Sequence, residues 1–249
     1  MRKSTFSFAV VIAAIVFSTQ GLQAQEKNET GKTRFILAAS WQPAFCATNQ
    51  RKPECGSQTK DRHDATNFSL HGLWPMRRNY CNVTADQRAA DKDGDWNKLP
   101  EVKLSADTQT ALAKAMPGTQ SGLERHEWIK HGTCMGLAAD EYFNLSLRLM
   151  GELNASAVRD LFAANIGKSL KVEEIKQAFD KSFGAGAGDR VKMSCRRVGN
   201  LRMISELTIG LSEDAVSKEG GTPQLGKLIQ NAGSTTAGCN EGVVDAVGS

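Results

Sequence analysis

Short apolar segments towards both ends of the chain flank a middle part with a helical repeat. Near the start, Arg34–Trp41 and Phe68–Leu73 are apolar and are each followed closely by a proline, which predicts two buried strands. In the middle, apolar residues recur at helical spacing, which predicts helices over Leu123–His131, Asp140–Leu153, Ser156–Asn165 and Val172–Phe183. Ser105 is a candidate N-cap for a further helix through Met116, which Pro117 and Gly118 would end.

The late part of the chain returns to strands. Arg190–Cys195 and Leu201–Gly210 are rich in apolar residues around a basic turn and should pair antiparallel, and Gly242–Val247 is a candidate final strand. Two polar, charged stretches, Gln50–Thr66 and Asp86–Leu104, are interpreted as a loop and a long surface excursion. Strands, then helices, then strands indicate an α+β domain, and no repeat or linker divides it.

The first 24 residues have the order of a secretory signal peptide. Arg2 and Lys3 precede an apolar run from Phe6 to Phe17, and polar residues then lead to Ala24. The run is shorter than the roughly 20 residues that span a bilayer, so a membrane anchor is disfavoured. We expect residues 1–24 to be removed, residues 25–32 to be a disordered lead-in, and residues 33–249 to form one catalytic domain. The mature protein should be a soluble monomer, exported to the periplasm or the extracellular medium.

The overall charge does not identify a partner. The formal net charge is +4, and without Arg2 and Lys3 the chain carries 29 basic and 27 acidic residues. Attraction for a nucleic acid would have to come from local patches such as Arg77–Arg78 and Arg196–Arg197.

The even number of cysteines downstream of an export signal indicates disulfides. The six are Cys46, Cys55, Cys81, Cys134, Cys195 and Cys239. Six cysteines allow 15 pairings, and the pattern alone does not choose among them. A structural zinc site is disfavoured because no two cysteines have the close spacing of zinc motifs.

Three of the four histidines fall in two short segments. The first is His71-Gly72-Leu73-Trp74-Pro75, and the second runs from His126 to Cys134. At about 100° per residue, a helix through the second segment places His126, Glu127, Lys130 and His131 on one face and apolar residues on the other. Such a face suits a catalytic site, although a solvated polar face is the ordinary alternative.

A zinc-protease motif must also be considered, because His126-Glu127 begins like H-E-x-x-H. That motif needs its second histidine four residues on, where this chain has Lys130, and His131 comes one residue late. Because of this spacing and the repulsive ammonium group, we expect no metal and no other cofactor.

Two histidines and a lysine without a metal suit the cleavage of RNA. A neutral imidazole can remove the proton of a ribose 2′-hydroxyl, and an imidazolium can protonate the departing 5′-oxygen. Lysine can stabilise the negative charge on the phosphoryl oxygens. DNA lacks the 2′-hydroxyl, so it would not be cleaved.

With these two segments the chain resembles the ribonuclease T2 family, whose active-site segments are both present and in order. The resemblance extends over nearly the whole mature chain and implies an antiparallel sheet flanked by helices. It implies His131 as general base, His71 as general acid, His126 as a phosphate ligand, and Glu127 and Lys130 as stabilisers of the transition state. The substrate would be single-stranded RNA, cleaved with little base preference to 2′,3′-cyclic phosphates that are then hydrolysed to 3′-phosphates.

The resemblance also implies the pairings Cys46–Cys55, Cys81–Cys134 and Cys195–Cys239. The chain departs from the family pattern where Gln42 separates Trp41 from Pro43, in a region that helps to form the family's base pocket. Trp74 and Trp41 are candidates for stacking on a base, although tryptophans in such positions are more often packing residues. Two other functions compete with the nuclease: an RNA-binding or signalling protein without turnover, and a metal-dependent hydrolase.

Overall fold

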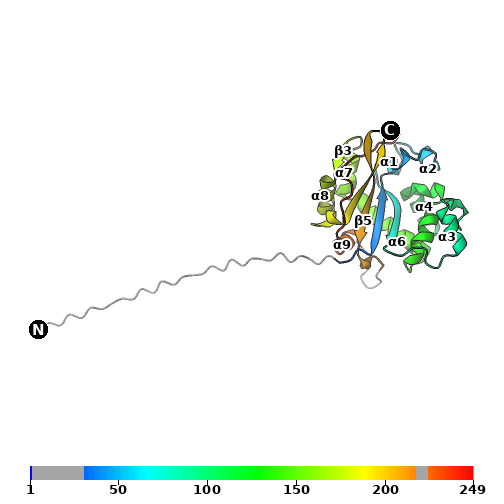
Figure 1. The fold of residues 1–249 in the computed structure, drawn as a ribbon, viewed down its shortest axis with the longest axis horizontal. Helices are drawn as coiled ribbons and strands as arrows, with labels where there is room; N and C mark the ends of the chain where they lie inside the picture. The colour runs from blue at the N-terminus through cyan, green and yellow to red at the C-terminus, as the bar shows by residue number, and fades with distance from the viewer. Residues whose placement is uncertain (2–30, 217–223, 249) are drawn as a thin grey trace.

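The computed structural model describes residue 1, residues 31–216 and residues 224–248 (Figure 1). Residues 2–24 of the predicted signal peptide and residues 25–30 of the predicted lead-in lie outside the described residues. Among the residues that are described, no helix has the length and apolar character needed to cross a bilayer.

The strands of the described residues form one sheet. Its strands are β1 (Phe35–Ser40), β2 (Ser69–Pro75), β3 (Ser169–Lys171), β4 (Val191–Val198), β5 (Leu201–Leu211) and β6 (Glu241–Val243). The order across the sheet is β2-β1-β5-β6-β3, and β4 also pairs with β5. All pairs are antiparallel except β5 with β6, which meet in parallel at Met203 and Val243.

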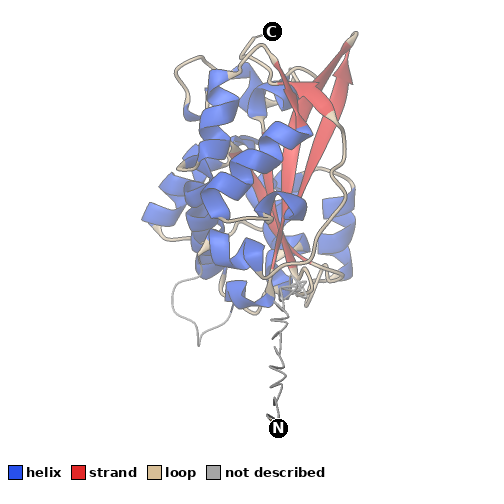
Figure 2. Cartoon of the chain, turned by 90° about the vertical axis from the view of Figure 1, so that its left-hand side faces the viewer, coloured by secondary structure: helices blue, strands red, loops and turns tan. Residues whose placement is uncertain are grey.

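Helices lie on both sides of the strands (Figure 2). They are α1 (Gln42–Cys46), α2 (Pro53–Gly56), α3 (Ala85–Lys92), α4 (Ala106–Ala115), α5 (Leu123–Lys130), α6 (Ala139–Asn154), α7 (Ala157–Ala164), α8 (Val172–Phe183) and α9 (Leu225–Gln230). In Figure 1, α7 and α8 lie to the left of the strands, and α3 and α4 lie to the right. Helices α5 and α6 both pack on β2. The predicted α+β class, a sheet flanked by helices, is confirmed.

Two polar stretches contain more structure than the sequence indicated. The stretch expected as a surface excursion contains α3, whose start is capped because Thr84 Oγ1 accepts from the Gln87 amide while Gln87 reaches back to the Thr84 amide. The stretch expected as a loop contains α2 and a 3-10 turn at His63–Ala65. Both stretches therefore contain short helices that lack a long apolar pattern: α3 starts at a capping box, whereas α2 starts at Pro53 and has no side-chain cap.

The structure contains three disulfides, the same pairings that the family resemblance implies: Cys46–Cys55, Cys81–Cys134 and Cys195–Cys239. The second bridge joins the loop after β2 to the 3-10 turn after α5. It therefore connects the two histidine segments.

Replacing Cys81 and Cys134 together with serine should destabilise the protein more than replacing Cys46 and Cys55. The sequence separations are 53 and 9 residues, and a longer closed loop removes more entropy from the unfolded chain. The chain-entropy relation gives a loss of about 4 kcal/mol for the long loop and about 3 kcal/mol for the short one. Urea unfolding of the two double variants measures both losses, and the reverse order would contradict the expectation.

Candidate active site

His71 occupies an irregular position in β2. Gly72 pairs with Ala38 and Leu70 with Ala39, so His71 is the extra residue of a β-bulge. Bulges redirect side chains and often lie beside active sites. The His71 side chain is 34% exposed, and its Nδ1 lies 2.6 Å from Glu206 Oε2.

Glu206 is a site residue that the sequence analysis missed. It lies on β5, next to Ser205. Ser194 pairs with Glu206 and Cys195 with Ile204, so Ser205 is the extra residue of a second β-bulge. Its carboxylate accepts from His71 and, at 3.4 Å, from Ser40 Oγ. Glu206 is the one acidic residue of β5, in a strand whose residues are mostly buried, and this is the signal that could have identified it.

Glu127 lies at the centre of the cluster. It is fully buried on α5, and its Oε2 accepts from Trp74 Nε1 at 2.7 Å. Its other oxygen, Oε1, lies 3.8 Å from the Nε2 atoms of both His71 and His126 and has no hydrogen-bond partner among the described residues. Burial raises the pKa of Glu127 to about 7, although His71, Trp74 and Lys130 favour its charged form.

His126 is held in position by Asp91 and Trp96, which belong to the stretch Asp86–Leu104. Its Nδ1 lies 2.7 Å from Asp91 Oδ1, and the other Asp91 oxygen accepts from the Tyr80 hydroxyl at 2.7 Å. Trp96 stacks on the imidazole with 4.4 Å between ring centroids. Burial lowers the pKa of His126 in spite of Asp91. The sequence analysis missed Asp91 and Trp96, because it interpreted Asp86–Leu104 as a surface excursion, and it made no prediction for Tyr80.

His131 follows the last residue of α5 and has the opposite environment to His71. Its Nδ1 is buried without a hydrogen-bond partner among the described residues. Burial, together with the positive charges of Lys130, His126 and His71, lowers its pKa to about 3. Burial would also lower the pKa of His71, but the Glu206 hydrogen bond and the charges of Glu127 and Glu206 outweigh it, so the pKa of His71 is raised.

The two tryptophans proposed for base stacking have different positions. Trp74 is half-buried and lies between the two catalytic candidates, with ring centroids 5.1 Å from His71 and 5.5 Å from His131. Trp41 is fully buried, packs on Phe68 and Phe162, and donates to the Asp245 carbonyl. The stacking prediction for Trp41 is wrong because the core covers its ring.

Lys130 completes the five predicted positions. It is half-buried at the last position of α5 and forms no ion pair within the described part of the chain. Its positive charge nevertheless acts on the site, because it lowers the pKa values of both His126 and His131.

Among the described residues, one group of three side chains could hold a metal ion. His126, Glu127 and His131 each offer one ligand atom, and these atoms lie within 4.8 Å of one another. The prediction that this spacing excludes a metal is therefore wrong. His131 comes after the last residue of α5, and its side chain still lies close to those of His126 and Glu127. The argument from charge stands, since the Lys130 ammonium acts on the same group of side chains.

A cavity of about 420 Å³ opens beside His71 and Glu206, within the size range of ligand pockets. None of the other four predicted catalytic residues lines it. Its wall comes from β1, α1, the Cys46–Cys55 loop and β4, and its residues include Gln42, Phe45, Asn49, Lys52, Glu54, Trp96, Leu123 and Arg196. Gln42, the residue that departs from the family pattern, is thus part of this wall.

Comparisons with known proteins give a consistent result. The chain matches the model of the Ribonuclease T2 family over residues 32–221. Ribonuclease I of Escherichia coli (strain K12) is 30% identical over 232 residues, 84% of this chain and 86% of that protein. Ribonuclease 1 of Arabidopsis thaliana is 29% identical over 161 residues, 60% of this chain and 64% of that one.

Solved structures share the fold at low identity. The self-incompatibility-associated SF11-RNase of Nicotiana alata superposes with a TM-score of 0.52 and 19% identity, covering 78% of this chain and 95% of that one. RNase NT, crystallised in complex with 5′-AMP, superposes with a TM-score of 0.52 and 20% identity, covering 74% and 87%.

Proposed function

Because this chain belongs to the ribonuclease T2 family, we propose that it cleaves single-stranded RNA by metal-independent transesterification, with His131 as general base and His71 as general acid. The placement of the two histidines carries the proposal: they lie on either side of Trp74, with ring centroids 5.1 and 5.5 Å from its ring, and their pKa values are shifted in opposite directions. At neutral pH a histidine with a pKa of about 3 is neutral and able to accept a proton. A raised pKa favours the protonated form of His71, which is the form that can donate a proton. Environments that push two pKa values apart are how active sites assign an acid and a base.

The reaction follows from these protonation states. His131 takes the proton of a ribose 2′-hydroxyl, whose oxygen attacks phosphorus. His71 gives its proton to the departing 5′-oxygen, which leaves a 2′,3′-cyclic phosphate. In the slower second step the histidines exchange roles, and water opens the ring to a 3′-phosphate.

The remaining three residues act on the phosphate. Lys130 supplies fixed positive charge for the oxygens that become more negative in the transition state. An anionic phosphate raises the pKa of His126, and Asp91 on the far nitrogen favours the same protonated form. Glu127 has its free oxygen directed between His71 and His126, where it can stabilise the pentacovalent phosphorus through these histidines.

The cavity has a defined place in this scheme. His71 protonates the 5′-oxygen of the leaving nucleoside, and His71 lines the cavity, whereas His131 does not. The nucleoside on the 3′ side of the scissile bond therefore belongs in the cavity. RNase NT, which shares the fold, was crystallised with a nucleotide of this kind, one with a 5′-phosphate.

Single 2′-deoxy substitution tests this function. In an RNA oligonucleotide, replacing one ribose with deoxyribose should abolish cleavage at that nucleotide's own 3′ phosphate and leave the neighbouring cleavages unchanged. Cleavage at the substituted position at an undiminished rate would contradict an internal 2′-hydroxyl nucleophile.

Glu206 should act as a positioning residue for His71. The carboxylate raises the pKa of His71, so Glu206→Gln should lower it. The acid must be protonated, so activity is lost as pH rises through the pKa of His71. The high-pH limb of the kcat/KM profile should therefore move to lower pH in the variant, while the limb set by His131 stays in place. An unmoved high-pH limb would remove Glu206 from this role.

Export is proposed from the sequence alone. The apolar run Phe6–Phe17 behind Arg2 and Lys3 is typical of a signal peptide. Mass spectrometry of the protein recovered from the periplasm or the medium should find the chain beginning close to residue 25. An uncleaved chain retained in the cytoplasm would contradict export.

A further inference from the structure

Glu54 is a buried acidic residue in the wall of the cavity. It is 2% exposed, and its Oε2 accepts from the Ser121 hydroxyl. Within the described residues no Lys, Arg or His forms an ion pair with Glu54, and its Oε1 accepts no hydrogen bond. A carboxylate is costly to bury without donors, so this one calls for a ligand that brings N–H groups.

The neighbouring amides offer acceptors as well. The Asn49 amide nitrogen already donates to the Phe45 carbonyl and to Thr48 Oγ1. The Gln42 amide nitrogen lies 3.8 Å from Cys46 Sγ. The amide oxygens of Asn49 and Gln42 accept nothing from the described residues, so both are free for a ligand. Lys52 and Arg196 line the same cavity and add cationic donors, which can meet a base carbonyl or a phosphate.

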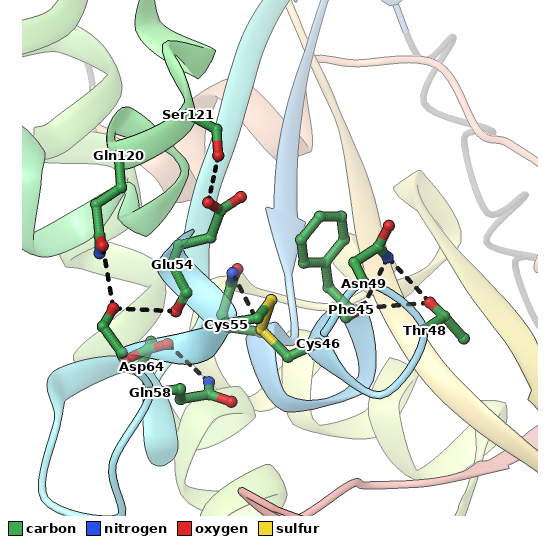
Figure 3. The surroundings of a disulfide bond; sticks show 12 residues. Phe45, Cys46, Thr48, Asn49, Glu54, Cys55, Gln58, Asp64, Gln120 and Ser121 are labelled. Carbon is green, nitrogen blue, oxygen red and sulfur yellow. Dashed lines mark hydrogen bonds between the residues drawn. A yellow bond between two sulfur atoms is a disulfide. The ribbon is translucent and has the colours of Figure 1, made fainter. Parts of the chain in front are cut away.

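An aromatic ring lies beside these acceptors. Phe45 is half-buried and lines the same cavity as Glu54. In Figure 3 the Glu54 carboxylate and the Phe45 ring point to the same side of the Cys46–Cys55 disulfide. A ring offers a stacking face for a nucleobase, and a carboxylate near it can accept from the base edge.

We propose that Glu54 makes this cavity select guanine in the nucleotide on the 3′ side of the scissile bond; the proposal rests on the function proposed above. The Watson–Crick edge of guanine carries two adjacent donors, N1–H and the N2 amino group, which match the two acceptors of a carboxylate. Adenine and cytosine each present one amino donor beside a ring-nitrogen acceptor. Uracil presents one N–H between two carbonyl oxygens, which a carboxylate repels. The expected order is therefore guanine first and uracil last.

Dinucleotide kinetics test the proposal. The wild-type protein is assayed on UpG, UpA, UpC and UpU, and kcat/KM for UpG should exceed that for UpU by at least about fivefold, the lower end of what one bidentate base contact discriminates. Glu54→Gln should reduce this ratio to near one. Glu173→Gln, an exposed acidic residue on α8, is the matched control and should keep the wild-type ratio. Equal rates on all four substrates, or an unchanged ratio in Glu54→Gln, would overturn the assignment.

Binding separates this proposal from the proposed chemistry. The four 5′-nucleoside monophosphates cannot be cleaved, so calorimetric titration of wild-type protein measures base selection without turnover and without a variant that must fold. Tighter binding of 5′-GMP than of 5′-UMP supports the guanine site even if no dinucleotide is cleaved, in which case only the proposed chemistry fails. Equal binding of all four nucleotides, together with cleavage that shows no base preference, would refute the guanine site and leave the ribonuclease activity standing.

Discussion

Replacing His131 or His71 with alanine should each lower kcat by at least about a hundredfold, the lower end of what one general acid or base contributes. The two losses have different origins. Alanine at position 131 removes the neutral imidazole that accepts the 2′-hydroxyl proton, and alanine at position 71 leaves the departing 5′-oxygen without a proton donor. Initial rates on UpG, with the fold checked by circular dichroism, measure both effects.

His63→Ala is the matched control for these variants. His63 is the fourth histidine and lies in the 3-10 turn before β2, and among the described residues no ring contact or hydrogen bond joins it to the other three. Its removal should leave kcat within a few-fold of wild type. Near-normal turnover in either the His71 or the His131 variant would overturn the acid and base assignment.

Gly72→Ala is expected to lower both the stability and the activity of the protein, because the added methyl group falls in the middle of the site. A Cβ at position 72 would overlap both the Glu127 carboxylate and the Trp74 indole nitrogen. Because these two groups are hydrogen-bonded and Glu127 is fully buried, neither can move without breaking that contact. Overpacking of this kind costs about 1–3 kcal/mol of stability. Displacing groups in a site by about 1 Å can cost about a hundredfold in rate, so we expect a kcat loss of that order.

Gly151→Ala provides the comparison for Gly72→Ala. Gly151 lies in α6, and an added Cβ would meet nothing within 4 Å. Alanine is favoured over glycine in a helix by about 1 kcal/mol, so this variant should be at least as stable as wild type and fully active. Urea unfolding and initial rates of the two variants make the comparison. Full activity in Gly72→Ala would show that the Trp74–Glu127 arrangement does not matter for catalysis.

The sequence predicted those elements whose apolar spacing is sustained. The helix over Val172–Phe183 was predicted with the bounds that the structure has, and Ser105 caps α4 as expected, accepting from the Thr108 amide. Elements without a sustained apolar pattern were missed. Helix α3 has eight residues but buries only Asp91, and α9 and β3 have only six and three residues.

The site was predicted in part for a similar reason. The two histidine segments are compact in the sequence, so their residue types could be recognised there. Glu206 and Asp91 come from distant parts of the chain, and only the pairing of β1 with β5 and the packing of α3 on α5 bring them to His71 and His126. The helical wheel also placed Glu127 on the polar face, whereas the structure buries it completely. A helical wheel gives the direction of each side chain around one helix. It does not show that β2 packs on the side of α5 that carries Glu127.

The products of RNA digestion test the central claim most directly. Single-stranded RNA and a DNA of matched sequence are incubated with the protein in excess chelator, and the new termini are identified by mass spectrometry. We predict cleavage of the RNA alone, with 2′,3′-cyclic phosphate ends that are converted slowly to 3′-phosphates. Cleavage that disappears in chelator and returns with added metal would contradict the account, and would assign His126, Glu127 and His131 to a metal ion.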